Sequence, residues 1–280
     1  MTRVRLLPDR VEKYVGGSIA GAGDKYEAMW KVAIEAGFIA PRLIGRDADQ
    51  GILLLERIRG AESIGRWYCK FLETDLEEDA WFSIVAEAGR TLAALHLGLD
   101  NVGAAVWRAP TEFVSALHAY GFDYRTLWEL PSRQLHGDFG FSNVLVSESS
   151  PGDVRIAVID PCADGYSCDD DIVRGPVHLD IGKFILCLEG LLPLRYQLRL
   201  KREVILRSQI AFLDGYGRHA PYHVDWEAAF AFAYGLGALY LRKAYPWTRW
   251  VAGRILYNHA WKRNAALTTK MAQVQGLLDG

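Results

Sequence analysis

The chain has 280 residues, half of them apolar, and its formal net charge is −2 at pH 7. A chain of this length and composition can bury a sizeable core, which excludes a disordered or fibrous protein. The nearly balanced charge gives no general positive field for a phosphate backbone, so we expect no nucleic-acid binding. Any recognition of charged ligands must therefore be local.

Targeting signals and cysteines bear on where the protein resides. The first eight residues lack the apolar run of a signal peptide, and the longest uncharged segment, 228–241, is too short to cross a bilayer comfortably. The four cysteines contain no C-x-x-C pair and are expected to be free thiols. These features predict a cytoplasmic protein with no membrane association, and they leave its oligomeric state open.

Residues 1–58 have the pattern of a small strand-rich unit. Apolar residues alternate on both sides of a Pro-Asp turn in 4–15, which predicts a hairpin with Lys13 on its second strand. Two short apolar runs separated by polar residues predict another hairpin over 43–55. One helix is expected between the two hairpins.

That helix follows a glycine-rich segment. Residues 16–23 hold four glycines and predict a loop, whose N–H groups could bind phosphate, although a mobile loop before a helix needs the same residues. Asp24 is expected to cap the helix, and Gly37 to end it. The apolar face is expected to consist of Met29, Trp30, Ala33 and Ile34.

From residue 59 onward the pattern is mainly helical. A capping box of Thr74 and Glu77 predicts a helix that ends at Gly98. Its apolar stripe consists of Trp81, Ile84, Val85, Ala88, Leu92 and Leu95. Residues 144–159 predict a hairpin, and the chain from Asp180 to the end reads as helices.

The most informative stretch is His136-Gly137-Asp138-Phe139-Gly140-Phe141-Ser142-Asn143, followed by a strand pair that ends in Ile159-Asp160. An Asp five residues before an Asn, in a loop that leads into an apolar strand, is the arrangement of the kinase catalytic loop, with Gly137 where protein kinases carry Arg. This pattern predicts a phosphoryl-transfer site.

Each residue of this stretch has an expected role. Asp138 would accept the proton of an incoming hydroxyl, and the alternative is an Asp that merely caps a turn. Asn143 and Asp160 offer oxygens that suit Mg²⁺, a hard cation that keeps several waters and also binds phosphates. His136 more simply braces the loop through hydrogen bonds, because Asp138 already handles the proton.

These residues together resemble the aminoglycoside phosphotransferase and choline kinase family, relatives of protein kinases that phosphorylate small molecules. The resemblance covers most of the chain and includes Leu53-Leu54-Leu55-Glu56-Arg57-Ile58-Arg59-Gly60, Leu92-Ala93-Ala94-Leu95-His96 and Gly175-Pro176-Val177-His178-Leu179-Asp180. It implies an α+β, bilobal protein-kinase-like fold. Residues 1–58 would form a small antiparallel-sheet N-lobe with one helix, and residues 59–280 a mostly helical C-lobe.

The resemblance also implies roles for residues outside the catalytic loop. Lys13 would contact the phosphates of ATP and pair with Glu27, while backbone groups from Glu56 to Ile58 would meet adenine. Asp180 would brace the catalytic loop. Two plainer readings stay open: Lys13 as a solvated strand residue, and Glu27 as part of a helix-capping box.

One departure from the family concerns the phosphate cover. Only twelve residues precede Lys13 and none is a glycine, so the usual glycine-rich turn between two strands is missing. The start of the chain could be recorded too late, the nucleotide could be covered differently, or the protein could be an inactive relative.

The sequence therefore predicts an ATP- and Mg²⁺-dependent transfer of phosphate to a hydroxyl of a small molecule, such as an aminoglycoside, an amino alcohol or a sugar. An inactive kinase-like scaffold is the alternative. A protein Ser/Thr kinase is disfavoured, because no Ala-Pro-Glu element lies between Asp160 and Asp180. Four acidic residues could attract an amine-bearing acceptor, or simply form a solvated loop: Asp164, Asp169, Asp170 and Asp171.

Overall fold

The computed structural model describes residues 4–15, 19–73, 76–99, 105–150, 153–161, 173–190 and 202–244. Its first part is a four-stranded antiparallel sheet in the order β1-β2-β4-β3. The strands are β1 (Val4–Leu6), β2 (Arg10–Tyr14), β3 (Leu43–Asp47) and β4 (Ile52–Glu56). Both predicted hairpins are confirmed. Lys13 lies opposite Leu53 of β4, which places it within the paired part of the sheet.

Helix α1 (Ile19–Ala36) packs against this sheet and differs from the expectation at its start. The predicted loop over 16–23 and the cap at Asp24 are wrong, since the helix already begins at Ile19; residues 16–18 lie outside the described residues. Gly23 serves close packing instead. A Cβ at this position would lie 2.5 Å from Nε of Arg46 on β3.

The buried face of α1 is also rotated from the predicted one. Met29 and Ala33 are buried as expected, but Ile34 is 63% exposed. The face that meets the core consists of Ala22, Gly23, Lys25, Tyr26, Met29, Val32 and Ala33. This rotation brings a lysine and a tyrosine, rather than Glu27, to the inner side of the helix.

A second sheet carries the predicted 144–159 hairpin, which is confirmed as β8 (Val144–Ser150) and β9 (Asp153–Val158), with β5 (Ala61–Ser63) alongside β8. Ile39, which follows α1, joins this hairpin. Its N–H donates to the carbonyl of Ile156 (2.9 Å), and its carbonyl accepts from the N–H of Val158 (2.8 Å). These bonds connect the first part of the chain directly to the hairpin.

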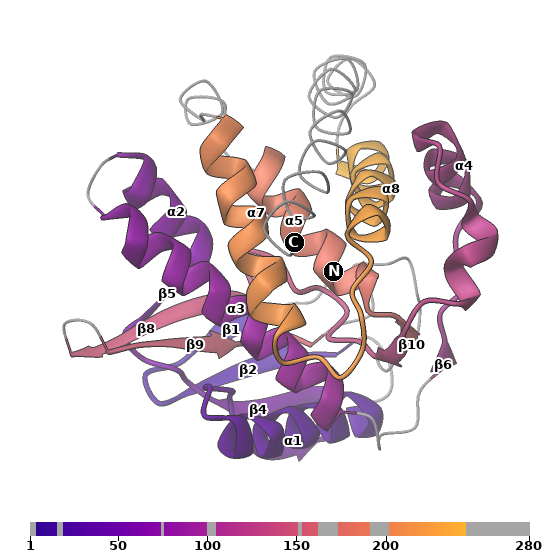
Figure 1. The fold of residues 1–280 in the computed structure, drawn as a ribbon. Helices are drawn as coiled ribbons and strands as arrows, with labels where there is room; N and C mark the ends of the chain where they lie inside the picture. The colour runs from indigo at the N-terminus through magenta and orange to yellow at the C-terminus, as the bar shows by residue number, and fades with distance from the viewer. Residues whose placement is uncertain are drawn as a thin grey trace.

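The remainder is mainly helical (Figure 1). The helices are α2 (Ile64–Leu72), α3 (Glu78–Gly98), α4 (Thr111–Tyr120), the 3₁₀ helix η1 (Tyr124–Trp128), α5 (His178–Gly190), α7 (Arg202–Gly217) and α8 (Trp226–Ala244). Helix α3 packs on α7, and both α4 and α5 pack on α8. A three-stranded sheet places β10 (Val173–Pro176) between β6 (Ala105–Val106) and β7 (Ser132–Gln134).

The predicted apolar stripe of α3 is buried in full, and the helix ends at Gly98 as expected. The predicted capping box is wrong, because the helix begins at Glu78 and Glu77 is its N-cap, with no side-chain cap hydrogen bond; Thr74 lies outside the described residues. The acidic residues 164 and 169–171 also lie outside them. Cys69 and Cys187 are free thiols. Over the described ranges, no helix combines the length and the apolar character needed to cross a membrane.

Candidate active site

The β8–β9 hairpin positions Asn143 and Asp160 at one of its ends. Val144 and Val158 are partners in the ladder, and just beyond them the N–H of Ile159 donates to the carbonyl of Asn143 (2.9 Å). Asp160 follows with φ of 56°, the one positive φ of a non-glycine residue in the described ranges. This left-handed conformation is uncommon outside glycine but is more accessible to Asp than to most residues.

Asp138 is tied to the same end of the hairpin through Asn143. The side-chain amide of Asn143 donates from Nδ2 to Oδ2 of Asp138 (2.9 Å) and to the carbonyl of Asp138 (3.0 Å). The Asp138 side chain is 28% exposed, whereas Asn143 is buried. The structure therefore brings the proposed base beside the proposed cation ligands and leaves the base reachable from solvent.

Asp180, at the start of α5, fixes the backbone of the catalytic loop through hydrogen bonds. Its carboxylate accepts the N–H groups of His136 (2.7 Å) and Gly137 (3.0 Å). Gly137 has φ of 96°, which a glycine adopts without a Cβ penalty. A further bond joins Asp180 to Nε2 of His96 (2.9 Å), whose Nδ1 contacts the hydroxyl of Tyr216 (2.7 Å). Asp180 and His96 are fully buried, so the loop rests on a rigid polar network.

His136 joins the loop that carries Asp138 to the turn that carries Asp160. Its Nε2–H donates to the carbonyl of Ile159 (3.0 Å), and Nδ1 accepts the N–H of Asp138 (3.3 Å). Burial lowers the pKa of His136 to about 4. The ring is therefore neutral at physiological pH, and its two hydrogen bonds hold the loop in place rather than carry a proton.

Lys13 reaches this group from the other sheet. Its side chain is buried, and Nζ pairs with Oδ1 of Asp160 and lies 3.3 Å from the hydroxyl of Tyr26 on α1. Burial lowers the pKa of Lys13, but the neighbouring Tyr26 and Asp160 outweigh it and raise the pKa above its usual value. Lys13 is thus a buried cation at the site and not a solvated strand residue.

The expected pairing of Lys13 with Glu27 is wrong. Glu27 is 51% exposed and binds Arg46 (3.0 Å), which also binds Asp24 (2.7 Å). Adjacent helix residues point about 100° apart. With Tyr26 on the inner face of α1, Glu27 is directed outward.

Three side chains of the candidate site were missed by the sequence analysis. Tyr26 contacts Lys13, as described above. Lys25 is fully buried and donates from Nζ to the carbonyl of His136 (3.1 Å). Lys183 on α5 lies 2.9 Å from Oδ1 of Asp138. Lys25 and Lys183 each lie on the buried face of a helix. Lysine is almost never buried unless it is paired, so a lysine among apolar helix residues was the signal that the sequence offered.

The residues predicted to meet adenine, Glu56 to Ile58, begin at the end of β4 and are called the hinge, because they lead from the four-stranded sheet to the rest of the chain. The N–H of Glu56 donates to the carbonyl of Arg42 (2.8 Å), so this donor is already used within the protein. Its side chain is exposed, and Ile58 follows in a segment without regular structure. The N–H of Glu56 is therefore not a donor that adenine could use.

The donor set of the site fits a magnesium ion. Asn143 supplies an amide oxygen and Asp160 a carboxylate, and Mg²⁺ is held by one or two such groups together with waters and substrate phosphates. In the part of the chain that the structure describes, no cluster of three or more His, Cys, Asp or Glu residues could hold a metal ion. Asn143 and Asp160 thus fit a cation that a phosphate ligand also binds.

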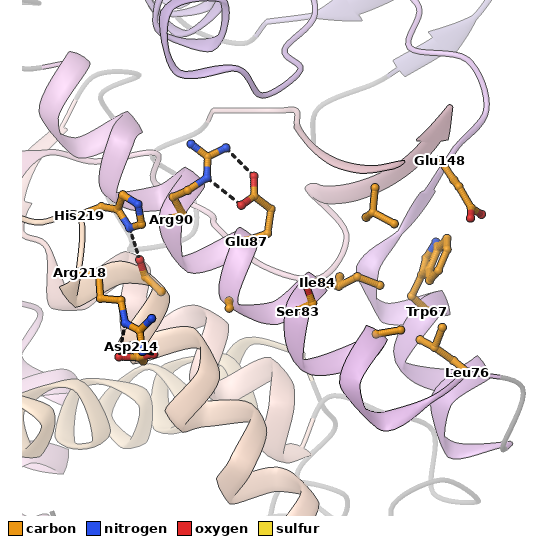
Figure 2. A pocket seen from close by; sticks show the side chains of 14 residues that line it. Trp67, Leu76, Ser83, Ile84, Glu87, Arg90, Glu148, Asp214, Arg218 and His219 are labelled. Carbon is orange, nitrogen blue, oxygen red and sulfur yellow. Dashed lines mark hydrogen bonds and ion pairs between the residues drawn. The ribbon is translucent and has the colours of Figure 1, made fainter. Parts of the chain in front are cut away.

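A separate hollow of about 510 Å³ contains none of these residues. Figure 2 shows it lined by α2, α3, the β8–β9 hairpin and α7, and dashed lines join several of its polar side chains to one another or to the backbone. Arg90 pairs with Glu87, Arg218 with Asp214, and His219 contacts the carbonyl of Gly215. The candidate active site is therefore defined by its converging polar groups and not by this hollow.

Comparisons with known proteins address the fold. No family model matches the chain, and no curated protein matches it in sequence. A solved glucosamine kinase in complex with glucosamine, ADP and inorganic phosphate superposes with a TM-score of 0.59 at 15% identity, covering 98% of this chain and 81% of its own. A crystal form of glucosamine kinase gives a TM-score of 0.61 at 18% identity, covering 96% and 78%.

Two further kinds of solved structure are similar. Choline kinase LicA from Streptococcus pneumoniae has a TM-score of 0.52 at 10% identity, covering 94% of this chain and 89% of its own. The GDP and kanamycin complex of APH(2")-IIia has a TM-score of 0.52 at 13% identity, covering 94% and 90%. The chain has the protein-kinase-like fold in the form that small-molecule kinases share, which confirms the predicted fold.

Proposed function

We propose that this protein is an ATP-dependent phosphotransferase that transfers the γ-phosphoryl group to a hydroxyl of a small molecule. The observation that carries the proposal is the hydrogen-bonded group of Asp138 and Asn143, at the same hairpin end as Asp160. A base and two cation ligands in one place are the parts that phosphoryl transfer requires, because its catalysis is mainly positioning and charge stabilisation.

The residues divide the work of the reaction. Asp138 accepts the proton of the acceptor hydroxyl and orients its oxygen towards the γ-phosphorus. A bond forms between these two atoms while the bond from phosphorus to the bridging oxygen breaks, and ADP leaves with the electron pair. Asn143 and Asp160 would hold Mg²⁺, which neutralises phosphate charge when bound.

Lys13 and the hinge serve the nucleotide. Lys13 binds Asp160 in this structure, and with nucleotide present its ammonium group would bind phosphate oxygens while Asp160 turns to the cation. Adenine would lie against the carbonyl of Glu56 and the N–H of Ile58. Lys25 ties α1 to the catalytic loop, so that the nucleotide side and the acceptor side keep a fixed spacing.

The acceptor is proposed at the level of a class. Structural neighbours are named as kinases of glucosamine and choline, and one is a complex with kanamycin. Each of these compounds combines a hydroxyl with an amino or ammonium group. We take amine-bearing alcohols and amino sugars as the first acceptors to examine, with plain sugars and nucleosides as comparison compounds.

The test is consumption of Mg-ATP by the purified protein across this acceptor panel. Wild type is expected to consume ATP with at least one acceptor, and Asp138→Ala to lose on the order of 10³-fold in kcat. Asp160→Asn should weaken the dependence on Mg²⁺ more than it lowers the melting temperature. No turnover with any acceptor, together with no thermal shift by Mg-ATP, would establish an inactive kinase-like scaffold instead.

A further inference from the structure

Lys183 lies in a buried stretch of α5 that is apolar except for Lys183 and Asp180. Residues 179–188 of this helix are all buried, and Lys183 itself is 8% exposed. Burying an ammonium group is unfavourable unless an anion or strong acceptors compensate it. The compensating anion is Asp138, whose Oδ1 lies 2.9 Å from Nζ of Lys183. The chain therefore maintains a buried cation directly on the proposed base.

The catalytic loop is shaped to admit this lysine. Gly140 lies two residues after Asp138, and a Cβ built there would meet Cε of Lys183 at 2.9 Å and Sγ of Cys187 at 3.4 Å. The loop is tightly folded around this glycine, since Gly140 donates to the carbonyl of Asp138 (2.8 Å) and accepts from the N–H of Asn143 (2.9 Å). The stem of Lys183 thus passes over Gly140, where any larger residue would push it away.

Position also separates Lys183 from the other site lysines. Lys13 contacts Asp160 on the cation side, and Lys25 contacts the loop backbone. Lys183 alone among these three contacts the carboxylate that would receive the acceptor proton. A cation within ion-pair distance of that carboxylate is also close to where the acceptor oxygen and the γ-phosphorus form their bond.

We propose that Lys183 is a catalytic residue that binds the transferring phosphoryl group on its acceptor side. This inference rests on the proposed function. As the acceptor proton passes to Asp138, that carboxylate loses its negative charge, and Lys183 is released to bind the equatorial oxygens of the phosphoryl group, which carry charge in the transition state. A preorganised, buried donor of this kind is a large catalytic contribution because water does not weaken it.

The test combines a binding readout with kinetics. With Lys183→Met, kcat for the acceptor found above should fall on the order of 100-fold, as for loss of one transition-state donor. Affinity for Mg-ADP with aluminium fluoride, a mimic of the transferring phosphoryl group, should fall at least tenfold by calorimetry. Affinity for Mg-ADP alone should stay within twofold of wild type, since ADP lacks the group that Lys183 binds.

Gly140→Ala provides a second variant that keeps the charge of Lys183 and displaces its stem. Gly140 is not among the glycines with positive φ, so alanine is compatible with its backbone. The same selective loss is expected, even if Lys183→Met fails to fold. Lys70→Met is the control, because Lys70 on α2 forms a partly exposed pair with Glu62 on β5. It should leave kcat and both affinities unchanged.

The outcomes separate the two proposals. A wild type that turns over substrate, with both Lys183→Met and Gly140→Ala as active and as tight on aluminium fluoride as wild type, overturns the role of Lys183 alone. Equal loss of Mg-ADP affinity with and without aluminium fluoride also overturns it, since Lys183 would then only support the fold. A wild type that consumes no ATP and binds no Mg-ADP overturns the proposed function itself.

Discussion

The two sides of the candidate active site are held in different ways. On the catalytic-loop side, Asp180 is fully buried and binds two backbone N–H groups and a buried histidine. On the small-sheet side, which the four-stranded sheet β1-β2-β4-β3 and α1 form, Lys13 contacts the hydroxyl of Tyr26 and the carboxylate of Asp160, and the Asp160 side chain is 36% exposed. One side is fixed by the folded chain, while the other holds a cation that a nucleotide would redirect.

The difference indicates where preorganisation is needed. A base must be aimed before the acceptor arrives, so its loop is anchored through backbone groups that no ligand can replace. A cation that binds phosphate must exchange one anion for another, and a single ion pair with Asp160 permits this exchange. Changes on the loop side should therefore affect stability strongly, whereas those on the small-sheet side should mainly affect nucleotide binding.

Acidification should affect the loop side most. His136 and His178 are fully buried, and burial lowers the pKa of each to about 4. The unfolded chain therefore binds protons at these histidines more tightly than the folded protein does. The contribution of each neutral histidine to the free energy of unfolding is complete above pH 6.5 and is lost as the pH falls towards 4. The loss is roughly 3 kcal/mol for each histidine.

Urea unfolding between pH 8 and pH 4 measures this effect. His178→Leu should remove about half of the histidine contribution and flatten the curve, as judged against wild type so that carboxylate titration cancels. His118→Gln, at an exposed position of α4, is the control and should follow the wild-type curve. Parallel curves for His178→Leu and wild type would show that His178 is not held neutral by burial.

Asp180→Asn should have the next largest effect. The amide keeps the shape of the side chain but replaces one acceptor with a donor that faces the N–H groups of His136 and Gly137. The free energy of unfolding should fall by about 3 kcal/mol, as when one partner of a buried charged network is lost. Denaturation by urea at pH 7.5 measures it.

A matched control is Asp214→Asn, which removes a largely exposed pair with Arg218 one helical turn away. This variant should change stability by less than about 0.5 kcal/mol. A loss below 1 kcal/mol in Asp180→Asn would show that the loop is held by its other contacts, and the contrast between the two sides would weaken.

The fold and the loop side were accessible from the sequence because their signals are local. Asp138, Asn143 and the end of the next strand stand at fixed distances along the chain, and the strands between them alternate regularly. Hairpin pairing then brings residues 143 and 160 together without any long-range information. The spacing of the motif along the chain therefore determines most of its geometry.

The small-sheet side was not accessible in the same way. Whether Tyr26 or Glu27 meets Lys13 depends on where α1 begins and how it is rotated, and four glycines near its start favoured a loop. The packing of Gly23 against Arg46 comes from strand β3, over twenty residues later. Lys183 likewise reaches Asp138 from a helix 45 positions further on, which no local pattern could indicate.

Tyr26→Phe should affect nucleotide binding with little change in stability. It removes the hydroxyl that lies 3.3 Å from Nζ of Lys13 and keeps the ring. Loss of about 1 kcal/mol of positioning energy corresponds to roughly a fivefold increase in the Kd for Mg-ADP. Calorimetric titration measures this, and an unchanged Kd would show that Asp160 alone positions Lys13.

Glu27→Gln should have the smallest effect and completes the comparison on the same helix. Glu27 pairs with Arg46 on the surface, where a single ion pair contributes about 0–1 kcal/mol. Both the free energy of unfolding and the Kd for Mg-ADP should therefore stay near wild type, in the assays used above. If the Kd for Mg-ADP were instead tenfold higher in Glu27→Gln than in Tyr26→Phe, Glu27 would have to turn inward to Lys13 when nucleotide binds. Loss of a surface ion pair with Arg46 could not by itself weaken nucleotide binding that much.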